Sequence, residues 1–312
     1  MGVVPAWLVS VYEFPGRKWL SWFLILPLAL PSYVAAFVFY QLPEAAIPFL
    51  VWVRTNFTIE AFQRWELVIR YGILICMMAA VLYPYIYLAC RAAFSQQGRA
   101  LIESARCLGD SPRKTFFRVA IPLARPAMVA GAALVIMEVI NDYGAVNFFG
   151  VPTLTEGIFR TWFGMDDKVS ALRLAGIVML AVGILLGAEQ LFRGRARYAE
   201  AEGTRTPLQR KPLSRGRAVL ALLCCLIPLS IGFFYPVTRL IHWAWLNLTS
   251  ERATSLAFGE PLARGLLLAG TTALVVTLVA ALFSFGVRLG ANPVRQICFR
   301  IAGLGYATPG AV

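Results

Sequence analysis

Two carboxylates, Glu138 and Asp142, stand four residues apart in an otherwise apolar stretch. Asn141 and Tyr143 lie beside them, so the segment offers several oxygen atoms and two negative charges. Ionisable groups at membrane depth cost free energy unless they face a cavity or a partner, which makes them functional candidates. If the stretch is one helix, both carboxylates share a face. The spacing then predicts a translocation pathway or gate that attracts a cation.

Two other interpretations of these acids stay open. Either carboxylate can pair with Arg173 in the next apolar stretch, which is a structural role. Alternatively, the acids relay protons or sodium ions, as acids often do in secondary transporters. Enzymatic chemistry has little support, because the chain has a single histidine, His242, and no clustered metal ligands, so we assign no metal site. A G-x-x-x-x-G-K-S/T loop is also absent from the sequence, and we expect no ATP hydrolysis by this chain.

The polar segment 91–125 carries a second pattern, made of small residues and turn signals. Residues 101–108 favour a short helix, and Gly109 suits the left-handed residue that ends it. Ser111 and Pro112 suit the N-cap and first position of another helix. We therefore expect a helix, a tight turn and a second helix.

Further signals mark the two ends of that second helix. Pro122 and Pro126 are expected to end it and to begin the next apolar stretch. Arg113 and Lys114 occupy its first turn, where cations oppose the helix macrodipole. Membrane topology with phosphate contact, or contact with an acidic surface on a partner protein, explains this placement equally well.

Long apolar stretches must position both regions. Hydrophobic residues make up 59% of the 312 residues and charged residues 14%, against about a quarter charged in a soluble domain. A membrane helix needs roughly 20 predominantly apolar residues. Four such stretches contain no Asp, Glu, Lys or Arg, and two more contain a few: 20–42, 71–90, 218–238 and 265–287, then 126–149 and 172–192. The pattern predicts an all-α, polytopic membrane protein with six full spans.

The basic residues define the topology. Twenty of the 29 Lys and Arg residues lie in 13–18, 91–125, 193–217 and 288–300, whereas five lie in the alternate loops 41–66, 150–168 and 242–262. By the positive-inside rule, the first set of loops is cytoplasmic and the second periplasmic. The net charge of +13 then reflects topology rather than nucleic-acid binding. Contact of these residues with anionic lipid is a weaker expectation.

Segment 193–217 is basic, polar and rich in Gly and Pro, unlike its flanks, and it suits a cytoplasmic linker between two membrane halves. A short internal similarity points the same way: Pro15, Arg17, Ala29, Pro31 and Val34 recur at equal spacing as Pro293, Arg295, Ala307, Pro309 and Val312. Chance explains so short a match as well. Because both copies enter a new span from a cytoplasmic turn, we favour two homologous halves in parallel orientation.

These boundaries predict three parts. Residues 1–192 form a first half with a partial first span, four full spans and the loop 91–125. Residues 193–217 form the linker, and 218–312 begin a second half. Since the second copy of the loop would fall beyond Val312, we expect the chain to be a fragment with the second half truncated.

The segment 91–125 resembles the coupling loop of ATP-binding-cassette importer permeases. The spacing of Glu103-Ser104-Ala105, Gly109 and Val119-Ala120-Ile121-Pro122 is that of the family motif E-A-A, three residues, G, nine residues, I-x-L-P, with Ser104, Val119 and Ile121 as replacements. The resemblance implies a coupling helix that sits in a groove of a separate ATPase subunit. Glu103 would be a polar anchor, and Gly109 would permit close approach. The fixed spacing disfavours the alternative of a self-contained hairpin on the membrane surface.

Nearly the whole chain is similar to the fused, two-half permeases of periplasmic ferric-iron importers, most specifically in 13–40 and 101–163. Permeases of thiamine importers share this architecture. The resemblance implies the type I importer transmembrane fold in two tandem halves. It also implies import by alternating access of ferric iron, or of thiamine or another small solute.

The same resemblance implies the partners and the location. A periplasmic binding protein would dock on loops such as 150–168, and a dimer of cytoplasmic ABC ATPases would bind ATP and Mg. This chain would hold no cofactor and no nucleic acid, and it would lie in the lipid bilayer of the bacterial inner membrane.

Overall fold

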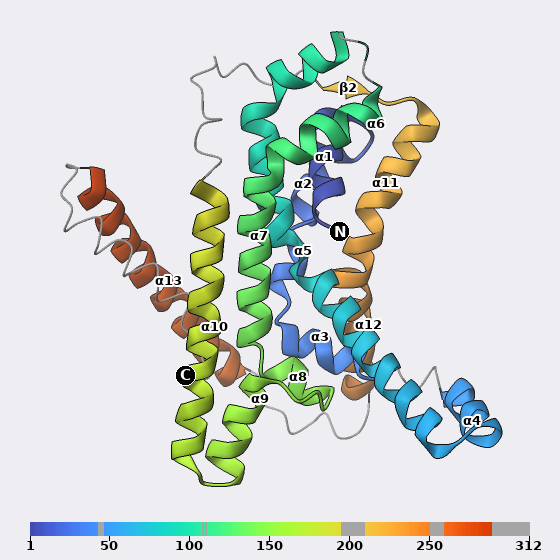
Figure 1. The fold of residues 1–312 in the computed structure, drawn as a ribbon, viewed down its shortest axis with the longest axis vertical. Helices are drawn as coiled ribbons and strands as arrows, with labels where there is room; N and C mark the ends of the chain where they lie inside the picture. Colours follow the sequence, from blue (N-terminus) through green and yellow to red (C-terminus); the bar gives the residue numbers. More distant parts are fainter. Residues whose placement is uncertain (43–46, 108, 110, 195–209, 250–258, 289–312) are drawn as a thin grey trace. The chain divides into compact units, whose positions relative to one another are not determined.

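The computed structural model describes residues 1–42, 47–107, 109, 111–194, 210–249 and 259–288, and Figure 1 shows an arrangement that is almost entirely helical. The elements, in chain order, are α1 Val3–Val11, β1 Tyr12–Glu13, α2 Arg17–Phe23, η1 Leu26–Ala29, α3 Ser32–Phe39, α4 Ile47–Asn56, α5 Ile59–Cys107, α6 Pro112–Thr115, η3 Phe116–Ala120, α7 Ile121–Asn141, α8 Gly144–Phe148, α9 Leu154–Phe159, η4 Arg160–Gly164, α10 Lys168–Gly194, β2 Lys211–Pro212, α11 Arg215–Leu229, η6 Ser230–Phe234, α12 Tyr235–Leu248 and α13 Gly259–Arg288.

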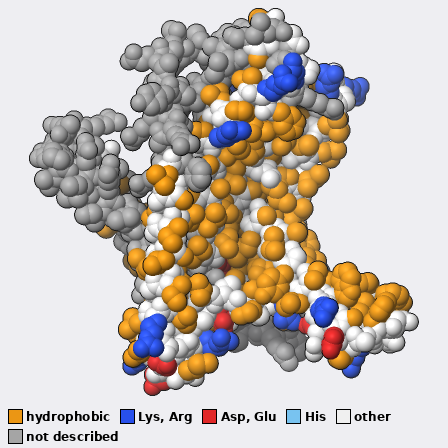
Figure 2. Space-filling model, viewed as in Figure 1, with side chains coloured by type: hydrophobic (Ala, Val, Ile, Leu, Met, Phe, Trp, Pro, Cys, Tyr) orange, Lys and Arg blue, Asp and Glu red, His pale blue; other side chains and the backbone are white. Residues whose placement is uncertain are grey.

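Within the described residues, five helical segments are long and apolar enough to cross a membrane. They are Ile59–Ser95, Phe116–Asn141, Lys168–Glu189, Arg215–Leu248 and Gly259–Phe285. Each contains most of one predicted span, so the prediction of a polytopic all-α membrane protein is confirmed. Hydrophobic side chains cover the middle of the face in Figure 2, and charged side chains gather toward its ends.

The predicted continuous span 20–42 is wrong, because the structure breaks it. Arg17–Ala29 and Ser32–Phe39 meet at an angle of 85° and make a sixth crossing only if they are counted together. Leu30 is extended, with φ −97° and ψ 114°, and Pro31 caps α3. Proline has no N–H to donate and disfavours helical geometry in the residue before it, so the chain turns here.

Helix α5 is the central element of the first part of the chain, where α1, α3, α7 and η6 all pack against it (Figure 1). Three glycines allow their backbones to approach α5 closely. A Cβ on Gly2 would lie 2.7 Å from Tyr83 O, one on Gly131 2.8 Å from Ile86 Cα, and one on Gly232 2.0 Å from Ala80 O. Small residues at helix crossings are typical of membrane bundles, where packing rather than hydrophobicity drives association.

The end of the predicted linker is ordered against the start of the chain. Residues 195–209 lie outside the described residues, but β2 pairs in parallel with β1, and Leu213 N donates to Glu13 O at 3.1 Å. The buried Arg17 guanidinium supports β1 by pairing with Glu13 at 2.9 Å and donating to Val9 O at 3.3 Å. Helix α11 then adds buried residues to the core formed with α1, α2, α5 and α7: Ala218, Ala221, Cys225 and Leu229.

The chain divides into two compact units, one of Met1–Arg239 and one that begins at Leu240. In the second unit, α13 is exposed along its described side chains, 259–285. The division falls inside α12 rather than at 193–217. This division reflects contacts within the chain and does not test homology between its parts. The tandem halves 1–192 and 218–312 therefore stay a prediction. The second copy of the short repeat, Pro293 to Val312, lies outside the described residues.

Candidate functional site

The predicted turn at Gly109 and the helix after it are present, but the expected separate short helix over 101–108 is wrong, because residues 101–107 belong to the end of the long helix α5. Helix α5 continues to Cys107, and Gly109 follows with φ +86°, the left-handed conformation that the sequence predicted. Ser111 caps the next helix: Lys114 N donates to Ser111 Oγ at 3.4 Å, and Thr115 N donates to Ser111 O at 2.9 Å. A Cβ on Gly109 would have no neighbour within 4 Å, so the turn is open to solvent.

The residues of the predicted coupling motif occupy both arms of this hairpin. Glu103 and Ser104 lie in the last turns of α5, and Ala105 is buried there. On the second arm, Val119 lies in η3, and Ile121 and Pro122 begin α7. The side chains of Glu103 and Ser104 lie outside what the structure describes.

The expected break at Pro122 and Pro126 is wrong. The second arm continues without interruption from α6 through η3 into α7, so Pro112 to Asn141 form one helical rod. The π-helical turn η3 ends directly before Pro122, which stands in the first turn of α7 where a missing N–H costs little. The hairpin is therefore rigidly joined to the membrane helix that follows it.

Aromatic contacts fix the hairpin to the rest of the bundle. The Trp7 ring of α1 lies 5.3 Å from the Phe94 ring of α5 and 5.5 Å from the Phe116 ring of η3, measured between centroids. Thr115 is fully buried, and its hydroxyl donates to Ser111 O at 3.1 Å. By contrast, Phe117 is 66% exposed, with Lys114 and Arg118 exposed beside it. One face of η3 thus packs inward, and the other presents an aromatic ring between cations.

At the other end of α7, the structure corrects the predicted arrangement of the two acids. The helix ends at Asn141 and does not continue to residue 149, as the predicted stretch 126–149 had assumed, and Asp142 is extended with φ −78° and ψ 106°. Its Oδ1 accepts from Ala145 N at 2.8 Å, which holds the start of α8. The expectation that Glu138 and Asp142 share one helix face is therefore wrong. Asp142 has a structural bond that the sequence interpretation had not included.

Glu138 and Asn141 remain on one face of α7, three residues apart. The Tyr85 hydroxyl of α5 donates to Glu138 Oε1 at 3.4 Å. Asn141 Oδ1 is buried and has no hydrogen-bond partner among the described residues. The Tyr143 ring packs on α9, where its centroid lies 4.1 Å from that of the Phe159 ring. Of the four predicted pathway residues, two therefore stay together with a tyrosine that the sequence interpretation missed.

Helix α9 adds a third carboxylate to this end of the molecule. The buried Thr155 hydroxyl donates to Ile140 O, which fixes the start of α9 against the last turn of α7. Thr153 caps α9 by accepting from Glu156 N at 3.2 Å. The spacing Thr153-x-x-Glu156 is a capping-box signal visible in the sequence, and it would have placed Glu156 in the first turn of a helix.

Arg173 lies on the exposed side of α10. Hydrogen bonds from Ser170 lower the pKa of the Asp167 carboxyl below its ordinary value of 3.8, and the charge of Arg173 contributes in the same direction. Asp167 precedes α10 and accepts from Ser170 N at 3.0 Å. The acid beside Arg173 is thus a helix cap in the loop.

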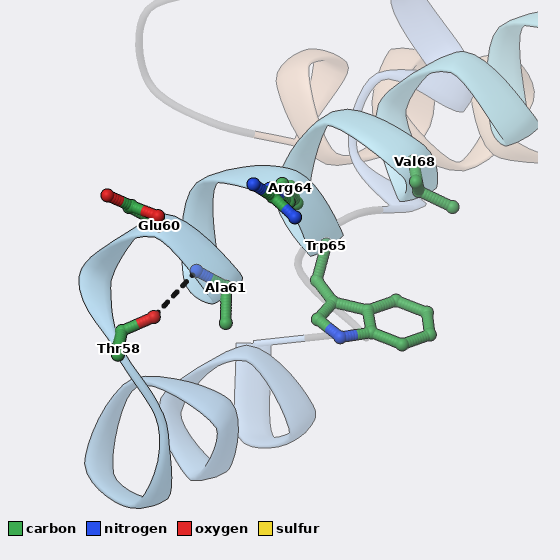
Figure 3. A pocket seen from close by; sticks show the side chains of 6 residues that line it. All are labelled: Thr58, Glu60, Ala61, Arg64, Trp65 and Val68. Carbon is green, nitrogen blue, oxygen red and sulfur yellow. Dashed lines mark hydrogen bonds between the residues drawn. The ribbon is translucent and has the colours of Figure 1, made fainter.

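Among the described residues, neither a cluster of metal ligands nor the cavity at the start of α5 coincides with these residues. Within the described chain, no group of three or more His, Cys, Asp or Glu side chains could hold a metal ion. An open cavity of about 440 Å³ lies at the start of α5 (Figure 3). Its lining residues come from one short segment, in which Thr58 Oγ1 accepts from Ala61 N: Thr58, Glu60, Ala61, Arg64, Trp65 and Val68. A groove along one helix encloses no ligand.

Comparisons with known proteins agree with this arrangement. The family described as "Binding-protein-dependent transport system inner membrane component" matches residues 1–188. The Fe(3+)-transport system permease protein FbpB 2 of Haemophilus influenzae is 26% identical over 284 residues, which are 90% of this chain and 51% of that protein. The sulfate transport system permease protein CysT of Escherichia coli is 31% identical over 147 residues, 47% of this chain and 50% of that protein.

The probable sulfate transport system permease protein cysT of Nephroselmis olivacea is 32% identical over 145 residues, 46% of this chain and 49% of that protein. The chain spans about half the length of the curated relatives it matches. No solved structure matches it significantly.

Proposed function

Because the chain belongs to the family of binding-protein-dependent transport system inner membrane components, we propose that it is the permease of an ATP-driven importer of ferric iron. A periplasmic binding protein delivers the iron, and a dimer of ATPase subunits drives alternating access from the cytoplasmic side. ATP and Mg are bound by those subunits. The protein lies in the bacterial inner membrane, as the family description suggests.

The observation that carries the transport mechanism is the hairpin at Gly109. Its turn projects without neighbours, its second arm is continuous with a membrane helix, and its inner face packs on Trp7 and Phe94. A partner that pushes on this turn therefore moves α7 as one rod. ATP can shift the two-state equilibrium of the permease only through such a contact, because a ligand acts by its differential affinity for the two states.

Two observations favour iron over sulfate as the solute. The ferric-iron relative matches over 90% of the chain, whereas the sulfate relatives match over less than half of it. In addition, Glu138 and Glu156 place carboxylates near the outer end of α7, where they repel an oxyanion and attract a cation. The higher local identity to the sulfate permeases keeps sulfate as the second candidate. Thiamine is a third, and secondary transport leaves the family match unexplained.

The test is uptake by the complete complex. The full-length permease, its ATPase and its binding protein are purified and reconstituted into liposomes, and uptake of radioactive iron, sulfate and thiamine is measured with and without ATP. We expect ATP-dependent uptake of iron alone. Uptake of sulfate or thiamine would overturn the assignment of iron. Uptake that follows a proton or sodium gradient and ignores ATP would overturn the assignment to an ATP-driven importer.

A further inference from the structure

Four side chains with oxygen atoms lie on α5, α7 and α9 near the C-terminal end of α7, which we expect to face the periplasm: Glu156, Asn141, Glu138 and Tyr85. We call them the outer oxygen row. Glu156 and Asn141 stand at the outer end of α7, and Glu138 lies three residues further in, about 4.5 Å along the helix axis. Tyr85 meets Glu138 from α5 at 3.4 Å. The row thus leads from the periplasmic surface toward the membrane interior.

Glu156 does not serve the structural role that its position suggests. At the third position of a helix capped by Thr153, a glutamate normally closes the capping box by accepting from the N-cap N–H. Among the described residues, no such bond is made. The Glu156 side chain is 17% exposed, and its Oε1 forms an ion pair with Arg160 Nε at 3.8 Å. Its Oε2 is buried and has no hydrogen-bond partner in the part of the chain that the structure describes.

Asn141 provides a second, independent acceptor at the same place. Its Oδ1 is buried and unpaired within the described chain, although it belongs to a different helix from Glu156. The Thr155–Ile140 hydrogen bond joins the two chain segments that carry Asn141 and Glu156, because each residue is next in sequence to one of the bonded pair. Buried polar atoms are normally paired, and those that are not call for a ligand or a water. Both atoms only accept, so the ligand must be a donor or a cation.

We propose that the outer oxygen row is the entry path for the transported cation, with Glu156 as a specificity-determining residue at its outer end. This inference rests on the proposed import of iron and extends it to particular side chains. Carboxylate, amide and phenol oxygens are hard ligands that suit a trivalent ion. The row has two carboxylates rather than a closed set of ligands, which suits an ion that must leave again. A sulfate ion would meet two carboxylates, which repel it.

The experiment uses Tb³⁺ as a trivalent probe of the full-length permease in nanodiscs. Its luminescence, excited through nearby aromatic rings, reports binding without any need for transport activity. We expect Glu156→Gln and Glu138→Gln each to weaken Tb³⁺ binding about tenfold, since site affinity follows the number of charged ligands. Glu156→Asp keeps the charge and should retain most of the affinity. Glu60→Gln, on the exposed start of α5, is the matched control and should bind as the unchanged protein does.

Uptake assays on the complete complex then separate this inference from the proposed function. The expected result is a higher KM for iron in Glu156→Gln, whereas Glu60→Gln should leave both the KM and the basal ATPase rate unchanged. Unchanged Tb³⁺ affinity in folded Glu156→Gln would overturn the entry path, even if iron is imported. A different outcome is that Glu156→Gln loses Tb³⁺ binding while the unchanged complex imports sulfate and no iron. That result would support a cation site and overturn iron as the solute. If Glu156→Gln does not fold, Glu138→Gln and Asn141→Ala carry the test, and unchanged affinity in both overturns the proposal.

Discussion

Helix α7 connects two regions that are built in different ways. At its N-terminal end, the hairpin is formed by residues close in sequence, from Gly109 and Ser111 to the π-helical turn η3. At its outer end, Glu138, Asn141 and Glu156 become neighbours through contacts between α5, α7 and α9, such as the bond from Thr155 to Ile140. One end is a helical hairpin with an exposed turn at Gly109. The other end has oxygen atoms of Asn141 and Glu156 that are unpaired among the described residues. In the proposed mechanism, the ATPase acts on the hairpin and the solute enters at the opposite end of α7.

This difference teaches where substitutions should act. A change at the hairpin should alter the response to the ATPase without changing which solute binds. A change at the outer end should alter solute selection and leave the ATPase contact intact. Each of the following predictions tests one side of this separation, beginning with the largest effect.

Gly109→Trp should cause the largest loss. The residue needs φ +86°, which an L side chain rarely adopts, and an indole at the open tip would hold the partner backbone away. We expect substrate-stimulated ATP hydrolysis by the reconstituted complex to fall at least about tenfold, which corresponds to roughly 1.4 kcal/mol of coupling free energy.

Gly216→Trp is the matched control for this change, because Gly216 is also exposed and has no neighbour within 4 Å at its Cβ position. It should leave stimulation unchanged. If Gly109→Trp leaves both ATPase binding and stimulation intact, the coupling role of the hairpin is wrong.

Phe116 and Phe117 are adjacent in η3 and should respond in opposite ways. Phe116 packs on Trp7, and Phe116→Ala should lower the free energy of unfolding by about 2 kcal/mol, less than the loss for a fully buried phenylalanine. Phe117 is exposed, and Phe117→Ala should change that free energy by less than about 0.5 kcal/mol while weakening binding of the ATPase. Unfolding in SDS and co-purification with the ATPase measure the two effects. Equal effects of both variants on both measurements would contradict the two-faced hairpin.

The two regions also differ in how far the sequence predicts them. The hairpin follows from local signals, since a glycine after a helix and a Ser-Pro pair at the next start each have a conformational meaning in isolation. The apolar spans follow from composition in the same way. The break at Pro122 was predicted from the general effect of proline and was wrong, because η3 places that residue in a first turn. At Pro31 the same effect does break the chain, and there no break had been predicted.

The arrangement of side chains at the outer end of α7 could be predicted only in part, because it depends on the residue at which the helix ends. Periodicity placed Glu138 and Asp142 on one face, which assumes that the helix continues to residue 149. Asn141 instead ends the helix, because Asp142 bonds to Ala145 N and Gly144 packs against Tyr33, contacts that depend on α8 and α3. Tyr85 lies 53 residues from Glu138 in sequence, so no local pattern could have paired them.

Asp142→Ala should show that the role of Asp142 in holding the start of α8 is independent of the outer oxygen row. Loss of the bond to Ala145 N should lower the free energy of unfolding by about 1 kcal/mol, as loss of a helix cap does. The KM for iron should stay within about twofold, because the Asp142 carboxylate is bonded to Ala145 N at the start of α8. Asp142→Asn keeps an acceptor oxygen and should lose less stability than Asp142→Ala. A large rise in KM for iron in Asp142→Asn, with stability unchanged, would restore Asp142 to the pathway.

Asp167→Asn should have the smallest effect, one that depends on pH. The pKa of Asp167 is lower in the folded protein than its ordinary value of 3.8, so the ionised carboxylate contributes stability above about pH 4. That contribution is lost as the pH falls through the lowered pKa. The thermal midpoint of Asp167→Asn in detergent should therefore lie slightly below that of the unchanged protein near pH 7, and the two should converge at the acid end of the range. Asp166→Asn is the control, since asparagine tolerates the φ of +50° found there, and its midpoint should follow the unchanged protein at every pH. A constant difference between Asp167→Asn and the unchanged protein across the whole range would mean that the Asp167 charge does not stabilise the start of α10.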